Sequence, residues 1–514
     1  MSALSTSDSI AVIGAGTMGA GIAQVAAAAG HRVLLFDAAE GAAQLGINKT
    51  RKGLDRLIAK GKMTTEQAEE LVGRIIACGS LQELSSAKLV VEAIVEKLEI
   101  KQSLFAQLEE VCGNDVILAT NTSSISVTAI AAGLKQPERL VGMHFFNPAP
   151  VMKLVEVITG LASDCNALQT VYDTAASWGK HPVMAKSTPG FIVNRVARPF
   201  YAEALRVLQE GGSDVATIDA VMREAGGFRM GPFELMDLIG MDVNYAVTNS
   251  VYNAYFQDQR FLPSLVQQEL VQAGRLGRKT GHGFYNYAEG TEQTLPHTAA
   301  SGPKPERVIV GGTLVYGKGG VAESLIEQIQ DAGITVELSE EADHDFLWVD
   351  GVELRLTKGA MATELAAEEE LNELVLFDLA LDYNNATRIA IAKADQASEE
   401  ALQKAAGLFQ AIGKQVSVID DIPGMIVMRT VCMLANESAD AVNQGVCNAE
   451  AVDIAMKGGV NYPQGPLAWA DHLGIPLVAS VLENLALLYG EDRYRLSPLI
   501  QRKCFAGNNF FSES

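Results

Sequence analysis

Two ionisable side chains stand in apolar stretches of the sequence, where a purely structural role is hard to assign. His144 follows the apolar residues 140–143, and Glu156 lies within the apolar residues 154–158. An imidazole titrates near neutral pH, so a histidine is suited to taking up a proton from a reacting group. A core histidine with satisfied hydrogen bonds is the alternative, and these two residues alone leave both interpretations open.

Two further polar residues have similar contexts. Ser123 follows a predicted strand within Asn121-Thr122-Ser123-Ser124, and Asn194 interrupts the apolar start of a predicted helix. A hydroxyl and an amide can hydrogen-bond the oxygen atoms of a substrate. For Ser123, an ordinary helix cap is the alternative interpretation.

A glycine-rich turn near the N-terminus has the spacing GxGxxG. It follows the apolar residues 10–13, opens an Ala-rich helix that ends near Ala29, and is followed by Asp37 at the end of the next predicted strand, 32–36. The motif alone is weak, but this strand–turn–helix context is typical of dinucleotide binding. The residues expected at the cofactor are therefore Gly14, Gly16, Thr17, Met18, Gly19 and Asp37.

Each position of the turn has a physical task in this interpretation. Gly14 allows the tight turn, Gly16 lets the backbone approach the pyrophosphate, and Gly19 lets helix and strand pack closely. The free N–H groups at the start of the helix then hold the phosphates. Asp37 can accept hydrogen bonds from the ribose hydroxyls and would repel a 2′-phosphate, which favours NAD over NADP. A structural turn without a ligand is the alternative.

The elements that position these residues alternate between strands and helices in the first part of the chain. Further strands are expected at 89–93, 116–119, 140–143 and 154–158. This alternation predicts a parallel sheet with helices on both faces, whose strand ends place His144 where such sheets bind ligands. From Pro189 onward the apolar spacing becomes helical, with helices expected at 191–209, 215–222 and 241–256.

The second half of the chain repeats the first. Paired residues lie 234 positions apart without a gap over about sixty residues, among them Gly179-Lys180 and Gly413-Lys414, the segments 189–195 and 423–429, Glu203 and Glu437, Asp219 and Asp453, Gly231-Pro232 and Gly465-Pro466, Asp237 and Asp471, and Gly240 and Gly474. Such a register indicates an internal duplication. The segment 290–307, rich in Gly, Pro and Thr, is expected to separate the copies.

Composition excludes several classes of protein. The 514 residues are 48% hydrophobic and carry a net charge of -22, which argues against nucleic acid as a partner. No apolar run is long enough for a membrane span, and Met1–Ser9 lacks the features of a secretory signal, so a cytoplasmic protein is expected. The six cysteines are scattered, without a CxxC pair, and are expected to be reduced thiols. No metal is expected.

The motifs resemble those of the L-3-hydroxyacyl-CoA dehydrogenase family from residue 8 to 290. The resemblance lies in His144-Phe145-Phe146-Asn147-Pro148, Val151-Met152-Lys153-Leu154-Val155-Glu156-Val157, Asn121-Thr122-Ser123-Ser124, residues 189–195, and Gly277-Arg278-Lys279 with Gly283-Phe284-Tyr285. The whole-chain layout is similar to the long bacterial members assigned to phenylacetate breakdown. It implies NAD-dependent oxidation of a (S)-3-hydroxyacyl-CoA to the 3-oxoacyl-CoA, with 3-hydroxyadipyl-CoA as the expected substrate. The alternative is 3-hydroxybutyryl-CoA or a general fatty-acid β-oxidation substrate.

The resemblance implies a role for each polar residue. His144 is the base that removes the proton of the C3 hydroxyl, and Glu156 orients the imidazole and stabilises its charged form. Ser123 and Asn194 hydrogen-bond the substrate oxygens. Four further residues match family positions near the cofactor, namely Glu96, Lys101, Asn121 and Asn147.

Basic residues are expected to bind the substrate's charged groups. Lys52, Arg56 and Lys60 recur every four residues and would form one stripe on a helix, suited to the CoA phosphates. Arg56 and Lys60 also match CoA-contacting positions in short bacterial relatives, and a solvated helix face is the alternative. Arg229 stands where the second copy has Pro463 and is expected to bind the distal carboxylate of the adipyl chain. A surface or domain-bridging arginine is the alternative for Arg229.

The second copy lacks the catalytic set. Met428 replaces Asn194, Ala390 replaces Glu156, and Asp378 stands where His144 would map. We therefore expect a Rossmann-type α/β domain and an all-α 6-phosphogluconate-dehydrogenase-like C-terminal domain, followed by a degenerate, non-catalytic copy of the unit that covers apolar surface. The expected domains are 1–188, 189–290, 291–422 and 423–514, and a homodimer is expected.

Two rival classes of function share parts of this pattern. Other 3-hydroxyacid dehydrogenases of the 6-phosphogluconate type have the same two-domain layout but use a lysine base, against which the His144 and Glu156 pair argues. A non-catalytic NAD-binding sensor or scaffold would not need the intact set of Ser123, His144, Glu156 and Asn194.

Overall fold

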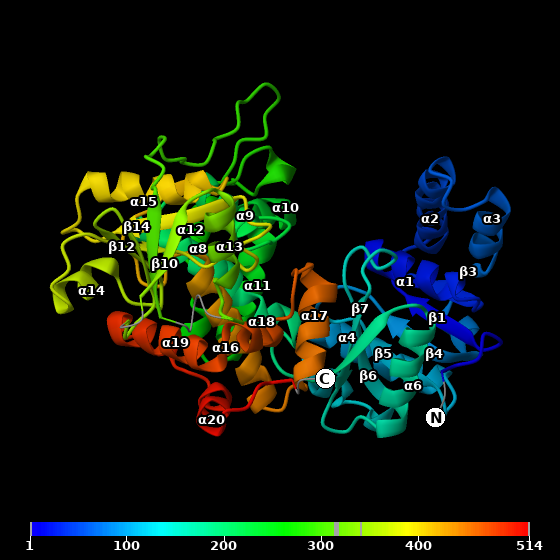
Figure 1. Ribbon diagram of the computed structural model, residues 1–514. Coiled ribbons are helices and arrows are strands. Elements are labelled where there is room, and N and C mark those ends of the chain that lie inside the picture. The colour runs from blue at the N-terminus through cyan, green and yellow to red at the C-terminus, as the bar shows by residue number, and fades with distance from the viewer. Residues whose placement is uncertain (1–2, 313–317, 340–341, 512–514) are drawn as a thin grey trace. The chain divides into compact units, whose positions relative to one another are not determined.

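The computed structural model of the protein describes residues 3–312, 318–339 and 342–511 (Figure 1). Met1 and Ser2, which begin the segment without a predicted secretory signal, lie outside these residues. The chain divides into two compact units: unit 1 holds residues 1–195 and 444–460, and unit 2 holds residues 196–443 and 461–514.

An eight-stranded sheet forms the centre of unit 1, in the order β3-β2-β1-β4-β5-β6-β7-β8. Its strands are β1 Ser9–Ile13, β2 Val33–Phe36, β3 Ile75–Cys78, β4 Ala87–Glu92, β5 Ile117–Thr120, β6 Leu140–Phe145, β7 Leu154–Thr159 and β8 His181–Lys186. Neighbouring strands are parallel except β6 and β7. The predicted wholly parallel sheet is wrong at this pair, because a loop without a helix joins β6 to β7 and only an antiparallel pair can be connected that directly.

Helices of unit 1 cover the sheet, and one of them comes from the far end of the chain. These helices are α1 Thr17–Ala28, α2 Ala42–Ala59, α3 Thr65–Gly73, α4 Leu98–Val111, α5 Val127–Ala131, α6 Cys165–Ser177 and α17 Ala449–Val460. Helix α17 lies against β7 and β8 (Figure 1). The Lys186 N–H donates to the Val446 carbonyl at 2.9 Å just before it. A Cβ on Gly459 would come within 2.8 Å of the Leu154 side chain, so glycine permits this close packing.

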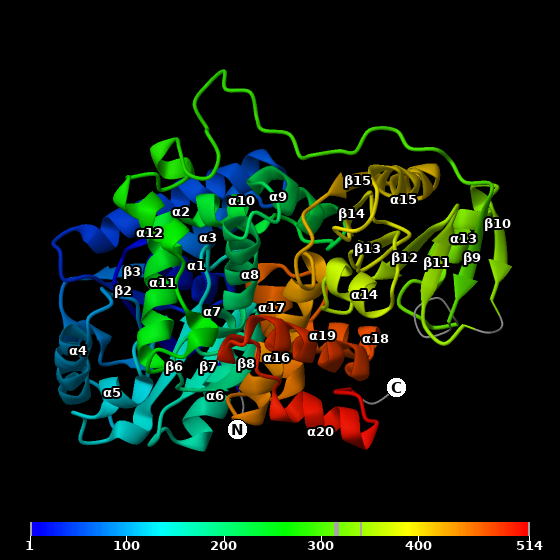
Figure 2. The ribbon, with the colours of Figure 1, turned by 90° about the vertical axis from the view of Figure 1, so that its left-hand side faces the viewer.

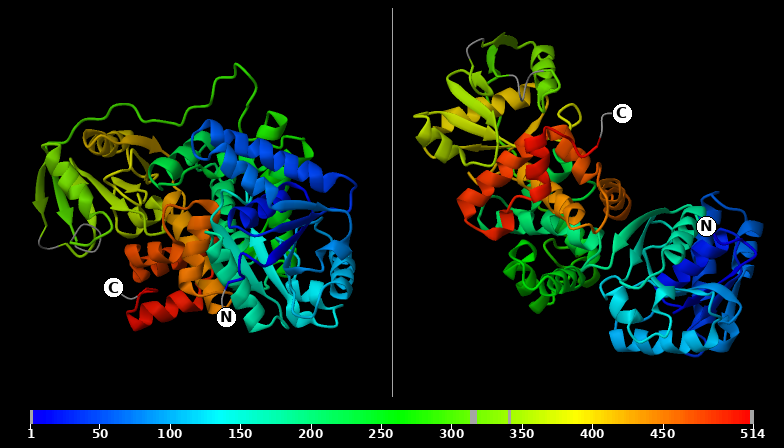
Figure 3. Two further views of the ribbon diagram at one scale, coloured as in Figure 1. Left: turned by 90° about the vertical axis from the view of Figure 1, so that its right-hand side faces the viewer. Right: turned by 90° about the horizontal axis from the view of Figure 1, so that it is seen from below.

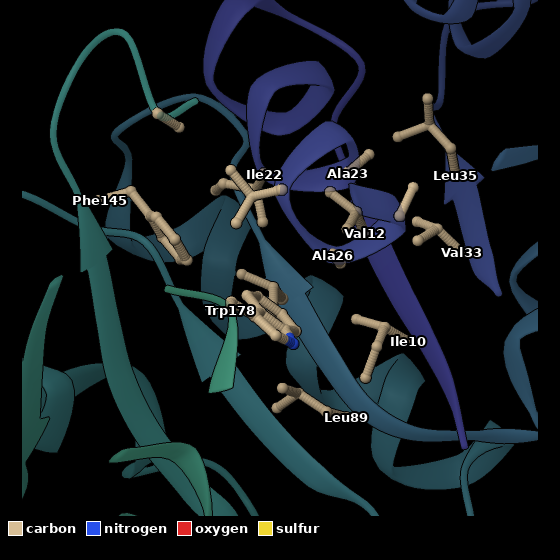
Figure 4. Close-up of a cluster of buried hydrophobic side chains, with 14 of the residues drawn as sticks. Ile10, Val12, Ile22, Ala23, Ala26, Val33, Leu35, Leu89, Phe145 and Trp178 are labelled. Atoms are coloured by element: carbon tan, nitrogen blue, oxygen red, sulfur yellow. The ribbon is translucent and has the colours of Figure 1, made fainter. Parts of the chain in front are cut away.

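A cluster of buried apolar side chains joins α1 to the sheet (Figure 4). Ile10 and Val12 of β1 belong to this cluster together with Ile22 and Ala23 of α1. Alanine combines a high helix propensity with a small side chain, so the helix can lie close to the sheet. Gly19 allows the closest approach, because a Cβ there would lie 1.8 Å from the Gly14 carbonyl oxygen. The core therefore fixes the start of α1 directly over the glycine turn.

The predicted single helix over residues 191–209 is wrong at its start. Phe191 has a φ of 47°, in the left-handed region, and a turn precedes the short helix α7 Val193–Val196. The helix α8 Arg198–Gln209 follows after a one-residue break, where Pro199 has no N–H to donate to the preceding turn. The same left-handed turn recurs in the second copy at Met425, with a φ of 51°.

Unit 2 contains both helical copies. The first has α8, α9 Val215–Glu224, α10 Pro232–Ile239, α11 Met241–Ala254, η3 Gln259–Phe261, α12 Leu265–Gln272 and η4 Arg278–Thr280. The second has α16 Val427–Asn443, α18 Pro466–Leu473, α19 Ile475–Tyr489, η5 Asp492–Tyr494 and α20 Pro498–Ala506. Helices α8 and α16 pack together, and buried ion pairs cross between the copies: Arg429 meets Glu203 at 3.4 Å and Arg260 meets Glu437 at 3.2 Å. The predicted packing of one helical copy on the other is therefore present within a single chain.

A seven-stranded sheet in unit 2 has the order β10-β9-β11-β12-β13-β14-β15. Its elements are β9 Arg307–Gly311, α13 Glu323–Asp331, β10 Thr335–Leu338, β11 Phe346–Val349, β12 Val352–Leu356, α14 Ala362–Glu368, β13 Leu374–Phe377, β14 Arg388–Lys393, α15 Glu399–Ala411 and β15 Gln415–Val418. Residues 288–306 reach β9 without a helix or strand, and Gly302 donates to Gln410 of α15 on the way (Figures 2 and 3).

Strands β12–β15 repeat the arrangement of β5–β8. Each set pairs parallel, then antiparallel, then parallel. The lysines of the repeated Gly-Lys pair make equivalent contacts: Lys180 donates to the Met152 carbonyl at 2.8 Å, and Lys414 donates to the Ala386 carbonyl at 2.7 Å. The duplication seen in the sequence is thus a duplication of backbone geometry.

Among the described residues, no single helix is long and apolar enough to cross a membrane; α18 and α19 meet the length and composition criteria only as a pair bent by 101°.

Candidate active site

His144 and Glu156 stand directly opposite each other on the antiparallel strands β6 and β7. The His144 Nδ1 and a Glu156 carboxylate oxygen, Oε2, are 2.7 Å apart, and both side chains are buried, with 5% and 1% of their surface exposed. His144 therefore lies within its strand rather than after it, as the sequence had suggested. The antiparallel pairing, which the alternation of apolar segments does not reveal, brings the two side chains together.

The second oxygen of Glu156 holds the turn that follows β8. Its Oε1 accepts the N–H groups of Ile192 and Val193 at 3.1 and 3.0 Å. With both oxygens engaged, the carboxylate is fixed, and it favours the imidazole tautomer that carries its proton on Nδ1. That tautomer leaves Nε2 as a proton acceptor. The rings of Phe146 and Phe191 pack at 4.6 and 5.9 Å from the imidazole and hold its orientation.

Ser123 belongs to a loop organised by Glu96. The Glu96 Oε1 accepts the backbone N–H groups of Ser123 and Ser124 at 2.9 and 3.1 Å and the Thr122 hydroxyl at 2.7 Å. The alternative that Ser123 is a helix cap is wrong, because Ser126 caps α5 by accepting the Ala129 N–H. The Ser123 hydroxyl lies 3.3 Å from the same Glu96 oxygen.

A buried lysine, Lys101, makes ion pairs with Glu96 and with Glu92. Lys101 is 1% exposed and contacts Glu92 at 2.6 Å and Glu96 at 3.2 Å. Burial raises the pKa of Glu96, but the hydrogen bond from Thr122, the charge of Lys101 and the N–H of Ser123 together hold that pKa below its usual range. Lys101, expected near the cofactor, is thus a positioning residue for Glu96. Glu92 was missed, although a glutamate ending a buried strand carries the signal that singled out Glu156.

Asn194 and Asn121 complete the network. The Asn194 Nδ2 donates to the Ser123 carbonyl at 3.5 Å, and Asn194 directly follows the Val193 N–H held by Glu156. Asn121 accepts the Phe145 N–H at 2.8 Å and so ties the end of β5 to the end of β6. Asn147 is exposed in the loop after β6. The structure thus brings His144, Glu156, Ser123 and Asn194 together in unit 1.

A cavity of about 710 Å³ opens beside the glycine turn. Gly14, Gly16, Asp37, Val95 and Ile100 are among the residues that line it. Gly14 has a φ of 96°, and an added Cβ would lie 2.5 Å from the Ala93 carbonyl oxygen, so only glycine fits there. An added Cβ on Gly16 would meet no protein atom within 4 Å, which leaves its backbone open to a ligand.

Asp37 has the position that a ribose partner needs. It follows β2, lines the cavity and accepts the Ala15 N–H at 2.7 Å and the Ala39 N–H at 2.9 Å. Each oxygen keeps a further lone pair for a hydroxyl donor. The adenosine half of NAD fits between the apolar side chains on one wall, the open glycine backbone and this carboxylate. The pyrophosphate of NAD fits the free N–H groups at the start of α1.

The glycine turn and His144 lie at the same end of the sheet. Strands β1, β4, β5 and β6 are consecutive neighbours and all parallel, so the glycine turn, Glu96, Ser123 and His144 follow one another along their C-terminal ends. Three strand spacings separate β1 from β6, roughly 14 Å. Among the described residues, no group of histidine, cysteine or acidic side chains is arranged to hold a metal ion.

The basic residues expected at CoA lie on the surface. Lys52 and Arg56 are exposed on α2, whereas Lys60 is the residue after its last turn rather than within the helix. Helix α2 reaches the cofactor turn, because Gly46 packs against the Ala15 carbonyl. Arg229 is exposed in unit 2, and among the described residues it makes no ion pair.

A dinucleotide cavity and a buried histidine–carboxylate pair at the same end of the sheet are features of an NAD-dependent dehydrogenase. Comparison with known proteins gives the family. The NAD binding domain of 3-hydroxyacyl-CoA dehydrogenase matches residues 9–188, its C-terminal domain matches residues 190–287 and again 424–509, and the 3-hydroxybutyryl-CoA dehydrogenase reduced Rossmann-fold domain matches residues 354–423. The chain belongs to the 3-hydroxyacyl-CoA dehydrogenase family, and the double match confirms the duplication and the degenerate second copy.

Individual relatives span the whole chain or its first half. The 3-hydroxyadipyl-CoA dehydrogenase of Escherichia coli is 44% identical over 98% of both chains. The 3-hydroxybutyryl-CoA dehydrogenase of Clostridioides difficile is 41% identical over 54% of this chain and 99% of its own. The solved structure of a 3-hydroxybutyryl-CoA dehydrogenase from Escherichia coli has a TM-score of 0.88, 44% identity, and coverage of 97% of this chain and 98% of its own. The protein is an NAD-dependent 3-hydroxyacyl-CoA dehydrogenase.

Proposed function

We propose that His144 is the general base of this reaction and that Glu156, Ser123 and Asn194 assist it. NAD, when bound, supplies the hydride acceptor. The Nε2 of His144 takes the proton of the C3 hydroxyl as that carbon becomes a ketone, and the Glu156 carboxylate stabilises the resulting imidazolium. Ser123 and Asn194 donate hydrogen bonds to substrate oxygens. The observation that carries this proposal is the buried 2.7 Å contact between His144 and a carboxylate whose other oxygen is fixed by the backbone.

The remaining site residues have proposed roles that follow from their positions. Asp37 selects NAD. The phosphate turn is formed by Gly14, Gly16, Thr17, Met18 and Gly19. Asn121 and Asn147 border the nicotinamide end of the cofactor. Glu96 orders the serine loop. Lys52, Arg56 and Lys60 bind the phosphates of CoA. The exposed stripe and the contact of α2 with the cofactor turn are in keeping with this role.

We propose 3-hydroxyadipyl-CoA as the substrate, in phenylacetate breakdown. Support comes from the full-length relative of that name, whereas the solved relative named for 3-hydroxybutyryl-CoA favours a short unbranched chain as the second candidate. Arg229 is the distal-carboxylate partner in this proposal, because its guanidinium is exposed and charged.

The cellular setting and the assembly are also proposals. We place the enzyme in the cytoplasm and divide it into domains 1–188, 189–290, 291–422 and 423–514. A homodimer is expected, although the two helical copies already cover each other within one chain, so a dimer would need another surface. Sedimentation at several concentrations measures this assembly.

The test of the proposed function has two parts. His144→Ala lowers kcat by about two to four orders of magnitude with nearly unchanged NADH binding, the usual size of a lost general base. Turnover within a few-fold of the parent would contradict the assignment. The parent enzyme is then compared on 3-hydroxyadipyl-CoA, 3-hydroxyhexanoyl-CoA and 3-hydroxybutyryl-CoA. The proposed substrate gives the highest kcat/KM, and a preference for the butyryl compound favours the alternative.

A further inference from the structure

A second cavity lies wholly within unit 2, lined by α8, by Thr248 of α11, by the loop that follows η3 and by the start of α12. Its volume is about 320 Å³, enough for a few carbon atoms with a polar end. Leu205, Phe261, Leu262 and Leu265 give it mainly apolar walls, and Arg198 stands among them. The cofactor site and the proton-transfer network, both in unit 1, use none of these residues.

Arg198 is a buried cation without an acidic partner. It is 6% exposed, and no carboxylate of the described residues lies within ion-pair distance of it. One guanidinium nitrogen, Nη1, donates to the Thr248 hydroxyl at 3.0 Å, the guanidinium lies 5.0 Å from the Tyr201 ring centre, and its Nε has no hydrogen-bond partner in the described part of the chain. A buried charge is normally paired, since leaving it unpaired is unfavourable. Residues that make a fold less stable in this way are expected at functional sites.

The duplication supplies an internal comparison. Position 198 of the first copy corresponds to Cys432 in the second, which is a buried, uncharged residue at the same point of the equivalent helix. The helix therefore does not need a cation at this position in order to fold.

The charge balance of the cavity indicates one carboxylate rather than a phosphate. The other two arginines at its wall are already neutralised: Arg206 pairs with Glu491 at 2.7 Å, and Arg493 lies 4.0 Å from Glu203. The one acid at the wall, Glu210, lies 3.5 Å from Arg429. Arg198 is the one arginine at the wall whose charge no acid of the described residues compensates. A planar guanidinium matches a carboxylate in a two-point contact.

We propose that this cavity binds a carboxylate carried on a short apolar chain, with Arg198 as its cationic partner. Two sources have this chemistry: the distal carboxylate of a dicarboxylic acyl substrate, and a free dicarboxylate such as adipate. The first source rests on the proposed function and would assign the distal carboxylate to Arg198 in place of Arg229; the second source does not rest on it.

The test uses Arg198→Met in the full-length enzyme, with Arg198→Lys as the charge-retaining variant. Arg198→Met raises KM for 3-hydroxyadipyl-CoA by tenfold or more and changes kcat/KM for 3-hydroxyhexanoyl-CoA less than threefold; Arg198→Lys recovers part of the loss. The melting temperature of Arg198→Met equals or exceeds that of the parent, because the change removes an unpaired buried charge. A merely structural arginine would give a lower melting temperature and parallel kinetic losses, and that result would overturn the proposal.

A binding measurement distinguishes the two sources. If adipate raises the melting temperature of the parent but not of Arg198→Met, while substrate selectivity is unchanged, the ligand is a free dicarboxylate. If Arg198→Met loses the selectivity for 3-hydroxyadipyl-CoA over 3-hydroxyhexanoyl-CoA, the bound carboxylate belongs to the acyl chain. If Arg229→Met and not Arg198→Met removes that selectivity, and adipate stabilises both variants equally, the proposal fails. Failure of the proposed function is separate, since it shows in the parent enzyme as poor turnover of 3-hydroxyadipyl-CoA.

Discussion

Glu156 and Asp378 hold the same two backbone N–H groups in the two copies of one turn, although they stand at different positions of the repeat. Glu156 accepts the N–H groups of residues 192–193, and Asp378 accepts those of residues 426–427 at 2.9 and 2.7 Å. Asp378 occupies the place of His144, whereas Ala390 occupies that of Glu156. The turn therefore needs a carboxylate in both copies, and only the first copy uses that carboxylate to hold a histidine as well.

Alanine at either position separates stability from catalysis. Asp378→Ala and Glu156→Ala both lower the free energy of unfolding by about 1–3 kcal/mol, because each leaves buried N–H groups without an acceptor. Only Glu156→Ala also lowers kcat, and Glu156→Gln is milder because an acceptor remains. Urea denaturation and kcat, measured on folded protein, check this pair. A comparable loss of kcat in Asp378→Ala would show that the second copy takes part in catalysis.

Cofactor choice depends on the charge of Asp37. Asp37→Asn keeps an acceptor for the Ala15 N–H, so the glycine turn stays in place while the negative charge is lost. The ratio of kcat/KM for NAD over NADP falls by about tenfold or more, since repulsion of the 2′-phosphate is removed. Asp37→Ala, which also releases the turn, weakens both cofactors. A parent enzyme that prefers NADPH would contradict this interpretation.

Binding of the CoA nucleotide depends on the exposed basic stripe. The double change Arg56→Ala with Lys60→Ala raises KM for the acyl-CoA and leaves KM for a short thioester without the nucleotide nearly unchanged. It also flattens the salt dependence of KM, because salt screens exposed charge pairs. Arg51→Ala, an exposed cation on another face of α2, is the control with no effect on KM. Equal effects on both thioesters would indicate a solvated helix face.

The loop of Ser123 responds to acid through Glu96. Its folded-state pKa is below the ordinary value, so the carboxylate contributes stability above about pH 4.3, the unfolded value, and this contribution is lost as the pH falls through the folded pKa. The melting temperature of the parent therefore exceeds that of Glu96→Gln near pH 7, and the difference shrinks towards pH 3. A difference that grows on acidification would mean that the carboxylate is destabilising when charged.

Unit 1 depends on α17, a helix that comes from the second copy. Gly459→Val pushes a side chain into Leu154 and Val193, next to Asn194, and so displaces α17 from β7. Both the melting temperature and kcat fall, as they do when residues 300–514 are removed and apolar surface is exposed. Gly133→Val, at an exposed glycine where an added Cβ would meet no atom within 4 Å, leaves both unchanged. A soluble and fully active truncated protein would contradict this dependence.

The cofactor site could be predicted closely because its signal is local. The glycine turn, α1 and Asp37 follow one another in sequence, and each step has a backbone reason that the residue types reveal. The duplication could be predicted for a similar reason, since a constant offset preserves both register and contacts. The predicted strands all exist, with ends shifted by one or two residues.

The parts that could not be predicted depend on pairings between distant segments. Sequence alternation gives strands but not their direction, so the antiparallel contact of β6 with β7, and with it the His144–Glu156 geometry, was missed. The left-handed Phe191 breaks a helical pattern that looks continuous from its apolar spacing. The role of Asp378 was hidden because the equivalent residue in the first copy is the histidine, not the glutamate whose task it performs.

The position of α17 also sets the order in which the protein can be completed during synthesis. Arg195 and Gln444, which touch through a 3.0 Å hydrogen bond, are 249 residues apart. At the pace of translation, about 5–20 residues per second, β7 and β8 remain uncovered for roughly 10 to 50 s after they leave the ribosome. A nascent chain stalled before residue 444 thus carries His144, Glu156, Ser123 and Asn194 on an unfinished unit 1, which is completed only when about the last seventh of the chain emerges.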